Sequence, residues 1–95
     1  MDLIKERFSD HVIRYGNMSL YFVKDAIDII MYCSENKIGL RGLDAFILSG
    51  AGIQPSMENS IWFKPKKDED YKKAIEFLSK RKNDRFVFEL FYDGY

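Results

Sequence analysis

An apolar helical pattern stops at Asn36, and an apolar run punctuated by two glycines begins at Ile38. Gly39 and Gly42 remove side chains at positions where another backbone or helix can then approach closely. Asp44 places a carboxylate inside the apolar run, and such a group must either point away from the helices or be paired. This passage therefore predicts a helix that leads directly into a strand carrying one unusual acid.

The first helix is predicted to begin at Ser19, whose hydroxyl could cap it, and to end at Asn36 in a left-handed conformation. Its apolar residues recur at helical spacings of three and four: Leu20, Val23, Ala26, Ile27, Ile30 and Met31. Cys33 follows the same spacing and is assigned to the core.

The remaining pattern predicts three strands and a second helix. A strand over residues 38–48 precedes a small-residue loop over 49–56, and residues 60–64 form a short aromatic strand that ends before Pro65. Acids at residues 68–70 start the second helix, because they lie over the positive end of its dipole. Residues 86–92 are aromatic and β-branched, with two apolar faces, which predicts a strand inside the sheet.

These elements predict an α+β fold, a two-layer α/β sandwich in the order α-β-β-α-β, with a short helix over residues 1–8. Both main helices are expected on one face of the sheet. If residues 11–15 form an additional strand, the order becomes βαββαβ and the fold ferredoxin-like. The 95 residues are expected to form one domain.

Composition narrows the class of protein. The chain is 46% hydrophobic and 32% charged, which is typical of a folded domain with a true core. No apolar run approaches the roughly 20 residues of a membrane span, and the N-terminal residues lack the apolar stretch of a secretory signal. The single cysteine fits a reducing compartment. We therefore expect a cytoplasmic protein.

The formal net charge is zero, but residues 64–85 carry nine Lys/Arg against five Asp/Glu. The basic residues of this Lys64–Arg85 cluster are Lys64, Lys66, Lys67, Lys72, Lys73, Lys80, Arg81, Lys82 and Arg85. A mixture of both signs is typical of a solvated helix face, so nucleic-acid binding through this cluster is kept only as the alternative function.

The residues that could carry catalysis are few. His11 is the only histidine, and nothing in the sequence places it near Cys33, as a thiol nucleophile and its base would require. Too few soft ligands are present for a zinc site, and Gly50 and Gly52 lack the third glycine and following helix of a dinucleotide loop. The sequence predicts no enzyme, no metal and no cofactor.

A binding surface is predicted instead on the side of the sheet opposite the two helices. Acids that interrupt strands must lie there, next to rigid aromatic side chains that contribute contact area. The candidate partner-binding residues are Asp44, Glu58, Asn59, Trp62, Glu89, Asp93 and Tyr95. An acidic and aromatic face of this kind, without cover from the chain itself, would suit a basic protein partner.

The sequence also resembles a known family of small bacterial proteins. The resemblance covers about residues 18–92 and rests on Met18-Ser19-Leu20, Asp25-Ala26-Ile27 with Tyr32 and Asn36, Ile38-Gly39-Leu40-Arg41-Gly42-Leu43-Asp44-Ala45-Phe46, and Asn59-Ser60-Ile61-Trp62-Phe63. These passages resemble the immunity protein 40 family of polymorphic and contact-dependent toxin systems, although Leu43 stands where the family pattern has a second glycine. The resemblance implies a non-enzymatic protein that binds and neutralises one cognate toxin, and it supplies no catalytic residues.

Overall fold

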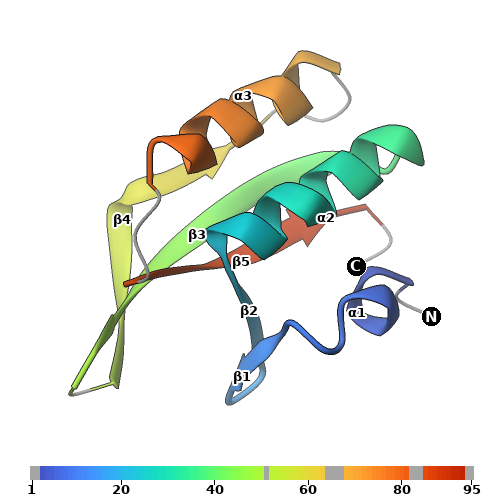
Figure 1. The fold of residues 1–95 in the computed structure, drawn as a ribbon. Helices are drawn as coiled ribbons and strands as arrows, with labels where there is room; N and C mark the ends of the chain where they lie inside the picture. The colour runs from blue at the N-terminus through green and yellow to red at the C-terminus, as the bar shows by residue number, and fades with distance from the viewer. Residues whose placement is uncertain (1–2, 51, 64–67, 82–84, 94–95) are drawn as a thin grey trace.

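The computed structural model describes residues 3–50, 52–63, 68–81 and 85–93. Three helices and five strands follow one another in these ranges (Figure 1). In chain order they are α1 (Leu3–Arg7), β1 (Ile13–Tyr15), β2 (Met18–Phe22), α2 (Val23–Glu35), β3 (Leu40–Ser49), β4 (Gly52–Trp62), α3 (Asp68–Ser79) and β5 (Phe86–Tyr92).

The strands form one antiparallel sheet in the order β1-β2-β5-β3-β4. Helices α2 and α3 pack side by side on one face of it (Figure 1). The α+β class, the two-layer arrangement and the succession α2, β3, β4, α3, β5 are those predicted from the sequence, as is the short N-terminal helix. Strand β5 lies between β2 and β3, and its apolar character on both faces fits this central position.

The prediction that residues 19–22 begin the first helix is wrong. Residues 18–22 form β2, which pairs with β1 through Ile13↔Leu20 and with β5 through Tyr21↔Phe88. Ser19 is therefore a strand residue, and the position before α2 belongs to Phe22, which makes no side-chain capping bond. Pairing with two neighbouring strands decides the structure of this five-residue segment. The helical spacing of its apolar residues is only a weak local preference, which tertiary contacts can override. From β2 onward the element order is the βαββαβ of the alternative fold, preceded by β1.

The prediction of a loop over residues 49–56 is also wrong. Strands β3 and β4 form a long hairpin whose register runs to Ser49↔Gly52, and Gly52 makes the turn with a φ of 120°. Pro55 pairs with Phe46 inside this hairpin. Proline is tolerated there because β4 is an edge strand, whose outward side needs no N–H donor.

The end of α2 differs from the prediction by one residue. Asn36 has a φ of −103°, and the left-handed residue is Lys37, with a φ of 55°. Asn36 donates from Nδ2 to the carbonyl of Tyr32, 2.9 Å away, and this oxygen also accepts a hydrogen bond from the Asn36 backbone N–H.

The main core lies between the sheet and the helices α2 and α3. Its fully buried members include Ile29, Ile30 and Cys33 of α2, Leu78 of α3 and Phe88 of β5. The predicted burial of Cys33 is thus confirmed. Leu43, Ala45 and Leu90 belong to the same cluster, which fixes the faces of β3 and β5 that look toward the helices.

Candidate functional site

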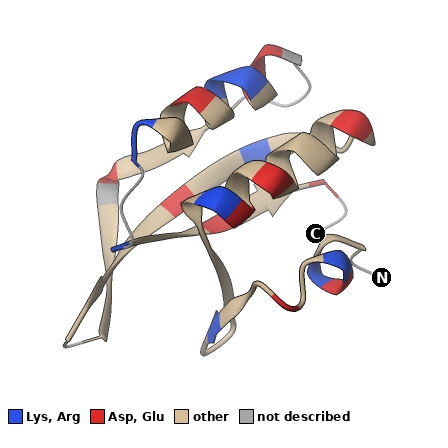
Figure 2. Cartoon of the chain, in the orientation of Figure 1, with Lys and Arg blue, Asp and Glu red and all other residues tan. Residues whose placement is uncertain are grey.

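Asp44 and Glu89 lie directly opposite each other on the neighbouring strands β3 and β5. Their chain neighbours Leu43, Ala45 and Leu90 point into the main core, so alternation along the strands places both carboxylates on the opposite side. We call this side the second face; its central residues are Gly42, Asp44, Trp62, Glu89 and Phe91. Figure 2 shows the two acidic segments next to each other on β3 and β5.

The local environment raises the pKa of Glu89 above its ordinary value. Partial burial is the main cause, because it disfavours the charged form, and the nearby Asp44 carboxylate acts in the same direction. Lys5 opposes both by favouring the ionised form. Neither carboxylate forms an ion pair with any residue that the structure describes. Among the described residues, these two acids therefore lie side by side without an ion-pair partner on a half-buried surface.

We expect the substitution Glu89→Gln to raise the melting temperature at neutral pH. An acid with a raised folded-state pKa contributes stability that is fully present below the unfolded pKa and is lost as pH rises through the folded pKa. The glutamine removes that loss, so the advantage of the variant should shrink as the pH falls through the ordinary glutamate range. Melting curves of both proteins across this range, with Glu58→Gln as an exposed control, would test the prediction; an unchanged or lower melting temperature at neutral pH would contradict it.

Trp62 lies beside these acids on the second face. It pairs with Gly42 across the hairpin, and its ring packs against Phe91 with a centroid distance of 5.0 Å and an interplanar angle of 35°. A Cβ atom at Gly42 would overlap the indole, so the missing side chain makes room for the ring. Trp62 nevertheless remains 56% exposed. Phe91 was not among the predicted site residues, although its position two residues after Glu89 indicates the same face.

Asp93 continues the second face beyond the end of β5. Its carboxylate accepts a hydrogen bond from Arg41 Nε at 2.6 Å, and its backbone N–H donates to the carbonyl of Gly39. A Cβ atom at Gly39 would overlap the Asp93 carboxylate. Arg41 is thus a further residue of this region that sequence reasoning missed, since nothing in the sequence pairs it with a residue 52 positions away.

Two other predicted residues lie apart from this group. Asn59 accepts a hydrogen bond from Arg81 Nε at 2.8 Å and donates to Ser56, which ties a bulge of β4 to the end of α3. Glu58 lies in the same bulge and is exposed. Tyr95 lies outside the described residues. The structure therefore brings together Asp44, Trp62 and Glu89, with Asp93 next to them.

The second face is also partly covered, in contrast to the expectation of a face without internal cover. Val87 is fully buried although it points away from the main core, as is Leu20 on β2. Sheet curvature explains this burial: β1 and the β3–β4 hairpin extend to the same side, away from α2 and α3 (Figure 1). A Cβ atom at Gly52 would lie 3.6 Å from the Tyr15 hydroxyl, so the two opposite edges of the sheet meet. The end with Asp44, Trp62 and Glu89 stays accessible.

No family model matches this sequence, and searches of curated proteins and of solved structures found no significant match.

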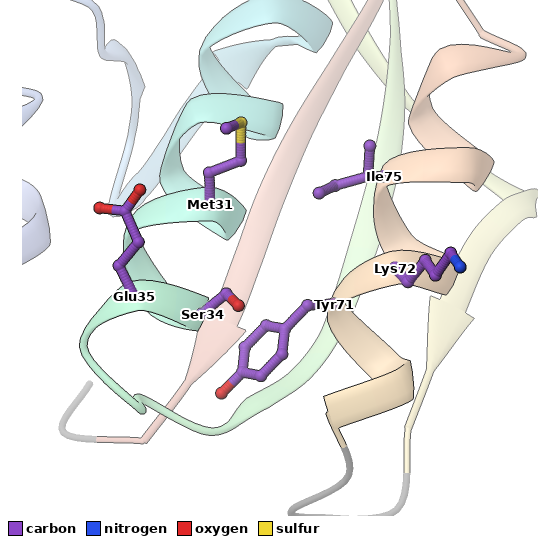
Figure 3. A pocket seen from close by; sticks show the side chains of 6 residues that line it. All are labelled: Met31, Ser34, Glu35, Tyr71, Lys72 and Ile75. Carbon is purple, nitrogen blue, oxygen red and sulfur yellow. The ribbon is translucent and has the colours of Figure 1, made fainter.

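A depression lies on the opposite side of the molecule, between α2 and α3 (Figure 3). Its volume is about 290 Å³, and its lining consists of Met31, Ser34, Glu35, Tyr71, Lys72 and Ile75. The Tyr71 hydroxyl donates to the carbonyl of Ile38, so it connects α3 to the segment between α2 and β3. The depression is small for a ligand pocket.

The remaining reactive side chains lie in separate places. His11 Nδ1 is 3.3 Å from Asp25 on an exposed part of the surface, whereas Cys33 has no exposed area. A buried thiol is not accessible to a substrate. Within the described ranges no group of three or more His, Cys, Asp or Glu could hold a metal ion, and no helix there is long and apolar enough to cross a membrane.

Proposed function

We propose that this protein is a bacterial immunity protein that binds and neutralises a cognate toxin in the cytoplasm without catalysing a reaction. The observation that carries this proposal is the juxtaposition of an exposed aromatic residue, Trp62, with Asp44 and Glu89 on one sheet face, two acids without an ion-pair partner among the described residues. Large exposed aromatic side chains beside polar groups are typical of protein-binding surfaces. The resemblance to the immunity protein 40 family points in the same direction.

The charge of this face suits a basic toxin, such as a nuclease. Nucleases carry basic residues where they bind phosphate groups, and an inhibitor that presents carboxylates there gains faster association and competes with the substrate. Neutralisation then needs no chemistry from the inhibitor: the occupied surface of the toxin is closed to nucleic acid.

The basic residues of α3 support nucleic-acid binding less well. Lys72 and Lys73 lie between the acids of residues 68–70 and Glu76 in the sequence of α3. Figure 2 shows acidic and basic segments following one another along this helix. Arg81 already has partners within the chain, because its guanidinium lies 3.5 Å from the centroid of the Phe77 ring and donates a hydrogen bond to Asn59. A duplex-binding face normally keeps its cations free for phosphates.

Sequencing the neighbouring upstream gene and co-expressing the C-terminal domain that it encodes with this protein would test the proposal, which expects that domain to be a toxin. We expect the protein to restore growth of cells that produce this domain and to co-purify with it. Failure to protect, together with failure to form a complex, would overturn the proposal. A parallel titration with nucleic acid tests the alternative, since phosphate contacts would give an affinity that falls steeply as salt is raised.

A further inference from the structure

We propose that the second face recognises an arginine side chain of its protein partner, with the guanidinium stacked on Trp62 and paired with Asp44 and Glu89. This inference rests on the proposed function, since it specifies the chemistry of the surface through which the partner is bound.

The first argument is the spacing of two rows of side chains. Gly42↔Phe91 and Asp44↔Glu89 are cross-strand pairs of the same two strands, and they are separated by two residues on each strand. Two residues along a strand span roughly 7 Å, and both rows lie on one face. Trp62 lies over Gly42 in the first row. The Trp62 ring and the carboxylates of Asp44 and Glu89 are therefore close enough together for one long side chain to contact all three.

The second argument is the fixed position and the exposure of the Trp62 ring. One side of its ring rests on the backbone at Gly42, and Phe91 holds its position. With 56% of the residue exposed, the indole can receive a planar group from outside. Cations bind favourably over the face of a tryptophan ring, and guanidinium groups also stack on it.

The third argument is the unfavourable electrostatic environment of Asp44 and Glu89. Asp44 and Glu89 repel each other, and partial burial raises the pKa of Glu89 because its charged form is poorly solvated. A cation from a partner relieves both effects. Of the described cations, Arg41 is bonded to Asp93, and Lys5 of α1 acts on Glu89 through its charge.

Arginine fits this arrangement better than lysine. Its guanidinium presents a planar fork of donors that can bond two carboxylate groups at once, and it loses less hydration than an ammonium group. A lysine ammonium would gain the charge interaction but not the stacking.

The single tryptophan of the chain provides a specific probe. We would titrate the intact ¹⁵N-labelled protein with capped Gly-Arg-Gly, Gly-Lys-Gly and Gly-citrulline-Gly peptides and follow the indole N–H signal by NMR. We expect a saturable shift with the arginine peptide, weaker binding of the lysine peptide and little response to citrulline, which keeps the shape but not the charge.

Two double variants decide which acids are responsible. Asp44→Asn with Glu89→Gln should weaken binding of the arginine peptide by at least about tenfold, as expected when close charge pairs are lost. Asp28→Asn with Glu76→Gln removes the same charge from exposed helix positions and should leave the affinity unchanged. Melting curves would establish that both variants are folded.

The inference is overturned if arginine and citrulline peptides act alike, if lysine binds as well as arginine, or if both double variants weaken binding equally. These outcomes leave the proposed function standing when the protein still protects cells from the toxin. Conversely, selective arginine binding without protection and without a toxin complex would refute the proposed function and retain the recognition chemistry.

Discussion

Replacing Phe88 with alanine should destabilise the protein by about 3–5 kcal/mol, the usual range for removing a fully buried phenylalanine. Phe88 has no exposed area and lies on the central strand β5, paired with Tyr21 on one side and Ala45 on the other. Its removal leaves a cavity between the sheet and the helices that this scaffold can fill only in part. Because domains of this size have a total stability of about 5–15 kcal/mol, the variant should lie near the limit of folding.

Urea unfolding followed by circular dichroism would measure this loss, with Leu3→Ala as the control. Leu3 is similarly apolar but 57% exposed, so its truncation should change the free energy of unfolding by less than about 0.5 kcal/mol. Equal effects of the two substitutions would show that Phe88 is not at the centre of the main core.

Reversing both charges in the variant Asp44→Lys with Glu89→Lys should weaken binding to the toxin by a few kcal/mol, on the order of what close interfacial charge pairs contribute. The two residues are register neighbours and have no ion-pair partner among the residues described, so a basic partner would lose two attractions and meet two repulsions. The matched control is Lys72→Glu with Lys73→Glu on α3, which changes the same number of charges at exposed positions of the helical layer.

Calorimetry with the purified toxin domain would compare these variants, and melting curves would show that each is folded. The control should bind nearly as tightly as the natural protein. If the α3 variant lost affinity and the sheet variant did not, the partner would bind the helical layer, where the depression around Met31 and Tyr71 lies.

Long periodic segments determined much of the fold. The helical spacing of Ala26, Ile30 and Cys33 and the continuous apolar run of β5 each select one structure, because only that structure buries the whole pattern. The class and the two layers follow from these segments. Short segments are different: residues 18–22 fit a helix and a strand equally well, and pairing with β1 and β5 decides between them. Residues 52–56 likewise become strand only because β3 offers a partner and the edge position admits Pro55.

The sequence by itself identified Asp44 and Glu89 as acids that an apolar core cannot easily absorb, and Trp62 as an aromatic residue next to polar sequence. It could not show that they are neighbours, because cross-strand register depends on contacts between residues as far as 52 positions apart, such as Leu40 and Tyr92. Tertiary structure alone decided that Asp44 stands opposite Glu89, that Gly42 makes room for the Trp62 ring, and that Asn59 turns toward Arg81. It also decided which end of the second face stays open, because the curl of the sheet buries Val87 and leaves Trp62 exposed and the two acids half-buried. Residue type is a local property, whereas adjacency and exposure arise only when the strands pair and curve.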